Sequence, residues 1–484
     1  MISFSRGDVS LSNSAESGRL TKGKGQGISV GGGKQAPACG SSVLNDVRRK
    51  DLRAANVRWC IIARILDAKM EILATFSFLN VARRSMAMKT KRIPRFAGVV
   101  HGLLLVSYAC GSPAVLAKAA ATHTYYIAAD ELTWDYGPGG TNRITGQPFG
   151  KDESQWMANG PHRIGKVYKK ALYREYTDAT FTRLKPRPKE WEHLGFLGPL
   201  LRAEVGDTIQ VVFKNNLKFP ASLHPHGMFY LKDSEGAPYH DGSGDESKKA
   251  VPPGATYTYT WLVPERAGPA HGDMSSVLWM YHSHVDEIAE VNAGLVGPMI
   301  VTARGMSKPD GTPKDVDREF VIAFAEVGET ESPYIQENIQ TYMGDPNGVK
   351  LIRDPFSVPM MVNNGPVGTD DLGLGDFNLK ESLNGFLFGN LPGVTMKVGE
   401  HVRWYVMATS NFELHAPHWH GNTVVIQHMR TDVATLLTMG MLVADMVPDN
   451  PGMWLFHCHV APHLRGGMQA LYTVEPKEPT QKPS

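Results

Sequence analysis

The clearest chemical signal in this chain of 484 residues is a cysteine between two histidines, His457-Cys458-His459, with His463 and Met468 close behind. A thiolate, an imidazole and a thioether together suit copper, and two histidines, one cysteine and a weak axial methionine bind the copper of blue electron-transfer proteins. Cys458 and His463 would then be two such ligands, with Met468 as the axial one. Because side chains alternate across an extended strand, His457 and His459 would reach a different metal ion.

Three further motifs supply closely spaced histidines. They are Leu223-His224-Pro225-His226-Gly227, Trp279-Met280-Tyr281-His282-Ser283-His284 and His415-Ala416-Pro417-His418-Trp419-His420-Gly421. A single His-x-His pair is weak evidence, because such pairs also occur on surfaces and in packed cores. Four motifs that use ten of the 18 histidines instead indicate a cluster of metal ions.

In this order the motifs HxHG, HxH, HxxHxHG and HCHxxxHxxxxM resemble those of the multicopper oxidases, over most of residues 122–476. The resemblance implies four copper ions in each subunit, of types 1, 2 and 3. The implied type 1 ligands are His415, Cys458, His463 and Met468, and the implied type 2 ligands are His224 and His418. The implied ligands of the type 3 pair are His226, His282, His284, His420, His457 and His459.

Two features of the chain resemble different branches of that family. Flanking segments such as His282-Ser283-His284-Val285-Asp286-Glu287 resemble the ceruloplasmin branch, whereas the number of domains resembles the small, two-domain laccases. The resemblance implies two cupredoxin-like Greek-key β-sandwich domains.

Composition and hydrophobic pattern also favour an all-β fold. Glycine and proline are frequent, at 49 and 32 residues, and short alternating segments such as Thr256-Tyr257-Thr258-Tyr259-Thr260-Trp261 are typical of half-buried strands between turns. The net charge of +2, with 20% charged residues, gives no basic footprint for nucleic acid. We therefore expect β-sandwiches with no nucleic-acid partner.

An internal repeat divides the motif-bearing part into two domains, residues 122–305 and 319–476, joined by a polar linker at 306–318. Gly206-Asp207-Thr208-Ile209 precedes His224 much as Gly399-Glu400-His401-Val402 precedes His418. The cysteine occurs only in the second half, so only that half could hold a type 1 copper. Residues 477–484 are expected to form a disordered tail.

The N-terminal part differs from the rest. Residues 88–119 combine a basic segment, a short apolar segment and the Ala117-Lys118-Ala119 cleavage pattern, which are the parts of a secretory signal peptide. Residues 1–87 would then reflect a start assigned too early, or a genuine extension. The apolar segment is too short to span a membrane. We therefore expect an exported protein, periplasmic or secreted.

Cysteine usage agrees with export. Cys39, Cys60 and Cys110 all precede the cleavage pattern, so only Cys458 would remain in the mature protein. With no intramolecular disulfide available, Cys458 would be free to act as a thiolate ligand.

The resemblance implies an enzyme that takes single electrons from a small reducing substrate and reduces dioxygen to water at a trinuclear cluster. Cys458 would carry the electrons to His457 or His459. The cluster needs a proton source, for which Asp286, Asp233 and Glu235 are candidates, and each could equally be a solvated loop carboxylate. Tyr230 stands where small laccases have a tyrosine near the cluster, although a packed aromatic would fit as well.

The substrate class is the least determined point. Ferroxidases of the ceruloplasmin type carry an acidic residue directly before the second type 1 histidine, where this chain has Pro462. Glu413, near His415, is one carboxylate and thin evidence for a cation site. We therefore expect laccase-like oxidation of phenols or aromatic amines, with oxidation of Cu(I), Fe(II) or Mn(II) as the alternative.

Two other classes use similar domains. A simple electron-transfer cupredoxin would leave eight histidines without a role, and copper nitrite reductases carry the type 1 cysteine in the first domain. The number of copper ions per chain distinguishes the classes: four for a multicopper oxidase, one for an electron-transfer cupredoxin and two for a nitrite reductase. The resemblance to small laccases further implies a homotrimer, in which the first domain of one chain and the second domain of its neighbour complete each cluster.

Overall fold

The computed structural model describes residues 120–477, except residue 162 and residues 243–248, 353–359, 364–377 and 410–412. The expected signal peptide, the segment before it and nearly all of the expected tail lie outside the described residues. Within the described part, no helix is long and apolar enough to cross a membrane.

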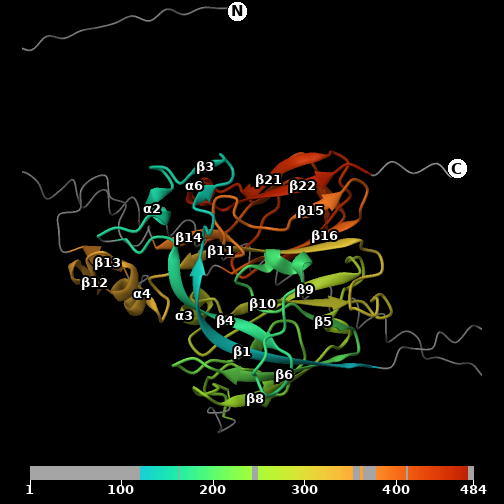
Figure 1. Ribbon diagram of the computed structural model, residues 1–484. Helices are drawn as coiled ribbons and strands as arrows, with labels where there is room; N and C mark the ends of the chain where they lie inside the picture. Colours follow the sequence, from blue (N-terminus) through green and yellow to red (C-terminus); the bar gives the residue numbers. More distant parts are fainter. Residues whose placement is uncertain are drawn as a thin grey trace, which may run out of the picture. The chain divides into compact units, whose positions relative to one another are not determined.

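The first half of the described chain is a sandwich of two four-stranded sheets (Figure 1). The first sheet, in spatial order, contains β4 (Val167–Tyr176), β1 (Thr122–Asp135), β6 (Thr208–Asn215) and β8 (Thr256–Leu262). The second contains β5 (Leu201–Glu204), β10 (Val296–Thr302), β9 (Ser276–His282) and β7 (His224–Pro225). The pairs β1–β6 and β5–β10 are parallel, so each must be joined by a crossover rather than a hairpin.

The second half repeats this arrangement. One sheet contains β14 (Leu379–Leu383), β11 (Arg318–Gly328), β16 (Val402–Ala408), β20 (Met441–Met446), β18 (Val424–Ile426) and β19 (Met429–Thr431). The other contains β15 (Thr395–Lys397), β22 (Gln469–Glu475), β21 (Gly452–Cys458) and β17 (Pro417–Trp419). Parallel pairs recur at β11–β16 and β15–β22, the counterparts of β1–β6 and β5–β10. The internal repeat is therefore a repeat of strand order, and the all-β prediction is confirmed.

Short elements complete the described part. The additional strands are β2 (Thr141–Asn142) with β3 (Gln147–Pro148), and β12 (Val349–Ile352) with β13 (Met360–Asn363). The helices are α2 (Ser154–Met157), η1 (Lys189–Leu194), η2 (Lys232–Ser234), η4 (Glu265–Ala267), α3 (Glu287–Ala293), α4 (Ile335–Tyr342), η5 (Pro346–Gly348) and α6 (Ala461–Gly466). Only α3 and α6 directly follow a histidine motif.

Each sandwich has its own apolar core, and a third core joins the two sandwiches. Leu278, Met280 and Ile300 of the first sandwich pack in that joint with Val321 and Met407 of the second. Every residue of β16 is buried, because one face of its sheet meets this joint and the other meets the second core. Figure 1 accordingly places β9 and β10 in the layer next to β16.

Buried ion pairs cross the same joint. Arg202 donates to Glu319 at 2.7 Å. Lys170 lies 2.5 Å from Glu329, and the side chains of Lys170 and Glu329 are fully buried. A buried charge that loses its partner is strongly destabilising. These pairs therefore disfavour other orientations of the two sandwiches.

Candidate metal centres

Three groups of possible metal ligands occur among the described residues, and all of them come from the predicted motifs. One is His415 with Cys458 and His463, and it is buried. The other two are His224 with His226 and His282, and His418 with His420 and His457. Within each group the candidate ligand atoms lie within 4.8 Å of one another.

The cysteine group has the geometry of a closed three-ligand site. Cys458 Sγ lies 3.5 Å from His463 Nδ1 and 3.9 Å from His415 Nδ1, and the two Nδ1 atoms are 3.1 Å apart. The three atoms therefore converge on one point, as soft ligands of a copper ion would. Burial lowers the pKa of His415 to about 3, so its ring is neutral and able to bind a metal.

Burial alone does not favour a thiolate at Cys458. It raises the pKa of the Cys458 thiol, against the opposing effect of the Ala416 backbone N–H, which donates to Sγ at 3.4 Å. A bound cation is the interaction that would stabilise the thiolate here. The residues present therefore fit a copper ion.

Local structure places the other members of this group. Cys458 ends β21, and α6 begins three residues later and carries His463 as its third residue. Gly467 ends α6 in the left-handed conformation, with a φ of 109°. Met468 follows it, fully buried, and its backbone bonds to both His463 and Cys458. The backbone of the predicted axial ligand is thus hydrogen-bonded to two residues of the cysteine group.

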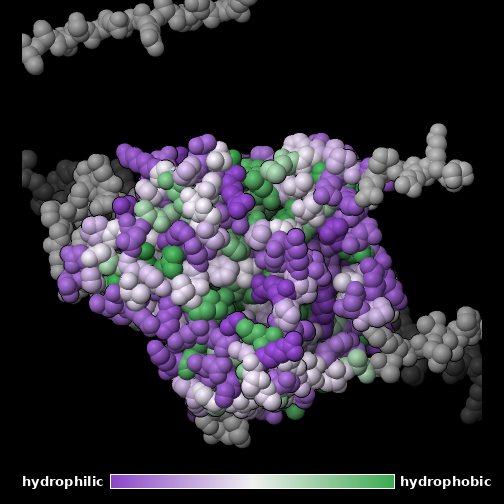
Figure 2. Space-filling model, in the orientation of Figure 1, coloured by the Kyte–Doolittle hydropathy of each residue, from purple (hydrophilic) through white to green (hydrophobic). Residues whose placement is uncertain are grey.

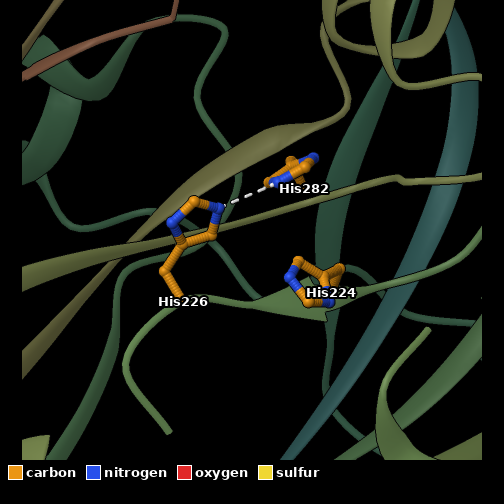
Figure 3. A group of neighbouring side chains, drawn as sticks. All are labelled: His224, His226 and His282. Atoms are coloured by element: carbon orange, nitrogen blue, oxygen red, sulfur yellow. Dashed lines mark hydrogen bonds between the residues drawn. The ribbon is translucent and has the colours of Figure 1, made fainter. Parts of the chain in front are cut away.

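The two histidine groups are built alike. Figure 3 shows His226 facing His282 across a gap, with Nε2 atoms 3.0 Å apart, while His224 approaches from β7. In the second sandwich, the Nε2 atoms of His420 and His457 are 3.1 Å apart. Two nitrogens that bind one ion at about 2 Å must lie roughly 3 Å from each other. Both pairs therefore suit a shared metal ion.

Backbone carbonyls orient these rings. In four of the histidines Nδ1 is paired with a carbonyl oxygen, which leaves Nε2 for a metal. The pairs are His224 with Glu235 at 2.7 Å, His282 with Ser283 at 3.0 Å, His418 with Asp432 at 2.8 Å and His457 with Cys458 at 2.7 Å. Burial also lowers the pKa of His226 to about 4 and that of His282 to about 3, so these rings are neutral.

The glycine that ends each HxHG motif lies against a tryptophan. Gly227 and Gly421 adopt left-handed φ angles of 73° and 71°. A Cβ at Gly227 would lie 2.3 Å from Trp279, and one at Gly421 would lie 2.3 Å from Trp454. The tryptophan that precedes each HxH motif thus packs on the turn that presents the facing histidines.

The two histidine groups remain separate within one chain. His284 contacts the rings of His224 and His282, and His459 contacts those of His418 and His457. Within the described part, no ring contact or hydrogen bond joins a histidine of the first sandwich to one of the second. We call the set His224, His226, His282 and His284 the first half-site, and the set His418, His420, His457 and His459 the second half-site.

The candidate proton donors lie on the segments that follow the histidine motifs of the first half-site, in different settings. Tyr230 packs its ring 5.9 Å from that of His224. Glu235 is ion-paired with Lys232 at 2.6 Å, Asp286 is exposed and caps α3, and Asp233 is exposed.

Sequence reasoning missed Glu287, whose carboxylate lies 3.3 Å from His284 Nε2. Its spacing of three residues from His284, across a helix start, was the available signal.

A group of carboxylates lies beside the cysteine group. Glu413 is half exposed, and its carboxylate lies 3.0 Å from His463 Nε2, on the far side of the ring from Cys458. Glu381, on β14, is buried against α6 and has one carboxylate oxygen without a partner. Burial, together with the charges of Glu326 and Glu413, raises the pKa of Glu381 to about 9. No motif pointed to Glu381 or Glu326.

The Gly421 contact yields a prediction. Replacing Gly421 with alanine adds left-handed strain and a clash with Trp454, so we expect a loss of about 2–4 kcal/mol of stability together with weaker metal binding at the second half-site. Gly399→Ala is the matched control, because Gly399 has a φ of 85° but open space around it. Urea unfolding and copper titration of both variants measure the effects. Equal losses in the two variants would contradict the Trp454 contact.

Comparisons with known proteins agree with this geometry. Two family profiles described as multicopper oxidase match residues 193–305 and 369–478. The chain is 42% identical over 360 residues to the ferroxidase HEPHL1 of Homo sapiens, covering 73% of this chain and 29% of that protein. It is 39% identical over 356 residues to ceruloplasmin of Rattus norvegicus, covering 72% of this chain and 32% of that protein.

A solved structure, that of a blue copper oxidase from Nitrosomonas europaea, is similar with a TM-score of 0.45 and 17% identity, over 74% of this chain and 86% of that one. The chain spans less than a third of the length of the two curated relatives named above. With two matching profiles and these relatives, and with its fold and motifs, this chain belongs to the multicopper oxidase family.

Proposed function

We propose that this protein is a metal-ion oxidase that couples one-electron oxidation of a reduced metal ion such as Fe(II) to the four-electron reduction of dioxygen to water. Copper bound at the three ligand groups would supply the one-electron transfer and the dioxygen reduction. In balance, four reduced metal ions, four protons and one dioxygen give four oxidised ions and two waters.

The observation that carries this choice is the carboxylate at His463. A histidine that binds a metal commonly donates its other ring N–H to a carboxylate, and Glu413 lies in that place. Because Glu413 is also half exposed, a cation that it binds would lie one imidazole ring from the cysteine group. Carboxylate oxygens also suit hard divalent cations. The arrangement therefore attracts the substrate ion and brings it close to the site that accepts its electron.

Glu326, opposite Glu381 in the β11–β14 pair, is a further acidic residue beside this region, whereas the raised pKa of Glu381 keeps that side chain protonated and uncharged at neutral pH. Clefts lined by one sign of charge raise the local concentration of the opposite ion. The relatives support the same choice, since one of them is named a ferroxidase. Pro462 pointed away from iron, but a carboxylate from another segment, Glu413, reaches the same histidine.

Oxidation of phenols or aromatic amines, our first expectation from the sequence, is the second candidate. Leu414 and Leu437 are 52% and 64% exposed. They lie next to His415 and Leu436, whose backbones are hydrogen-bonded to each other. An aromatic donor could stack on this apolar edge. The carboxylate at His463 favours the metal ion over such a donor.

Within the protein, Cys458 provides the connection between the groups. Its thiol lies in the cysteine group, while its chain neighbour His457 lies in the second half-site. Two adjacent residues, linked by one peptide bond, therefore join the site proposed for substrate oxidation to the site proposed for dioxygen reduction. Glu235, Asp286 and Glu287, beside the first half-site, are the proposed sources of protons.

We further propose that each trinuclear cluster forms between two copies of the chain. Each half-site carries four histidines, and large apolar side chains are exposed on the segments that lead into or out of the histidine motifs. Phe229, Leu231 and Ile288 are near the first half-site in sequence, and Val433 and Met453 are near the second. Figure 2 shows hydrophobic patches among hydrophilic residues on one face of the molecule. A head-to-tail contact of this kind closes into a ring, which we propose to be a trimer.

Cys458→Ser tests the redox assignment. The copper-loaded protein should show an intense blue absorption band, which the variant should lose together with nearly all substrate oxidation, because serine cannot supply the soft thiolate ligand. Copper at the half-sites should remain. Absorption spectra and copper analysis measure the outcome, and a variant that stays blue would rule Cys458 out.

Glu413→Gln tests the substrate class. The amide keeps an oxygen beside His463 Nε2 but removes the charge, so kcat/KM for Fe(II) should fall about tenfold while that for a simple phenol changes little. Glu265→Gln, which removes an exposed carboxylate paired with Arg304, is the control. Steady-state rates with Fe(II), Cu(I), Mn(II) and a phenol are compared side by side. A wild-type preference for the phenol would overturn the metal-ion proposal.

A further inference from the structure

We infer that Glu290 is a positioning residue that holds together the two backbone segments that carry the histidines of the first half-site. This role rests on the proposed function, because it concerns the histidines that would bind the trinuclear cluster. Glu290 lies on α3, six residues after His284, and it is 2% exposed. Its carboxyl group accepts the Val285 backbone N–H at 3.0 Å and forms a hydrogen bond with the side chain of Ser283.

Ser283 extends this contact to the facing segment. Its hydroxyl oxygen accepts the backbone N–H of Ser222 at 2.9 Å. The hydroxyl oxygen of Ser222 in turn accepts the backbone N–H of His284 at 3.0 Å. A continuous set of hydrogen bonds thus runs from Glu290 through Ser283 and Ser222 back to a histidine of the half-site.

The half-site needs this support because the strands that carry it barely pair. β7 has only two residues, and its ladder to β9 consists of His224 opposite His282 and Pro225 opposite Tyr281. The chain leaves β9 directly after His282. The Glu290 network therefore fixes the relative position of His224, two residues after Ser222, and His284, next to Ser283.

The second sandwich has a metal-ligand group at the equivalent place. Ser283 corresponds to Cys458, and the N–H of Ala416 donates to Cys458 Sγ as that of Ser222 donates to Ser283 Oγ. The helix that follows carries His463 in one case and Glu290 in the other, and ends in a left-handed glycine in both. An acid–hydroxyl pair therefore occupies, in the first sandwich, the position where the second has its cysteine–histidine contact.

Burial raises the pKa of Glu290, whereas its hydrogen bonds to Ser283 and the backbone oppose the rise. Glutamine has the same shape and can make hydrogen bonds to the same two partners. Leucine has a similar volume but would leave the Val285 N–H without its acceptor and would remove the carboxyl partner of the Ser283 hydroxyl, which would keep only its bond from the Ser222 N–H. The two substitutions therefore separate hydrogen bonding from packing.

The experiment uses the full chain loaded with copper, in the variants Glu290→Leu, Glu290→Gln, Ser283→Ala and the double variant Glu290→Leu/Ser283→Ala. Electron paramagnetic resonance and near-ultraviolet absorption report on copper at the half-sites, and the blue band reports on the cysteine group. We expect Glu290→Leu to weaken copper binding at the half-sites about 10–100-fold with the blue band unchanged. Glu290→Gln should stay within a few-fold of the wild type.

The double variant should be no worse than the more damaged single variant, because both substitutions break one network. Half-site copper that is unchanged in Glu290→Leu, equal loss of both signals, or additive effects in the double variant would each overturn the inference. Glu265→Leu, at an exposed site, controls for loss of a carboxylate. A wild-type protein without a blue band or half-site copper would instead refute the proposed function, so the two failures are distinguishable.

Discussion

The alternation of side chains at the end of β21 is the constraint on which the rest of the structure depends. Cys458 turns into the second core and meets His415 and His463, whereas His457 meets His418 and His420. One strand thus serves two ligand groups, and a covalent path of two adjacent residues connects them. A shift of one residue in the register of β21 would exchange the two sides and destroy both groups.

The duplication of the sandwich explains why the first half contributes histidines but no thiolate. Both halves use the same strands to present an HxHG segment against an HxH segment, and both pack a tryptophan on the intervening glycine turn. In the first half, Ser283 and Glu290 stand where Cys458 and His463 stand in the second. The buried joint fixes the two sandwiches against each other, and we propose that a second chain completes each cluster.

Much of the site could be predicted, because the ligands lie in short motifs whose spacing alone carries information. All of the predicted histidines fall in one of the three groups or in ring contact with one. The substrate edge was harder to predict, because it depends on segments far apart in the chain. Glu413 lies 50 residues before His463 in the chain, yet its carboxylate contacts that ring, and Glu381, on β14, lies near Glu413. From the sequence, Pro462 suggested an edge without a carboxylate to bind a cation. The fold supplies that carboxylate from another segment. Similarly, Asp286 looked closer to the histidines in sequence, but it caps α3 while Glu287 reaches His284.

The central claim is that two copies of the chain complete each cluster, and a mixing measurement tests it most directly. His226→Ala inactivates the first half-site and His457→Ala the second, so each variant alone should be inactive. When the two are expressed together, a mixed ring contains one interface with an intact half-site from each chain, and oxidase activity and half-site copper should return to up to about a third of the wild-type level in a trimer. A mixture that stays inactive although mixed rings form, or a fully active wild-type monomer by light scattering, would contradict the account.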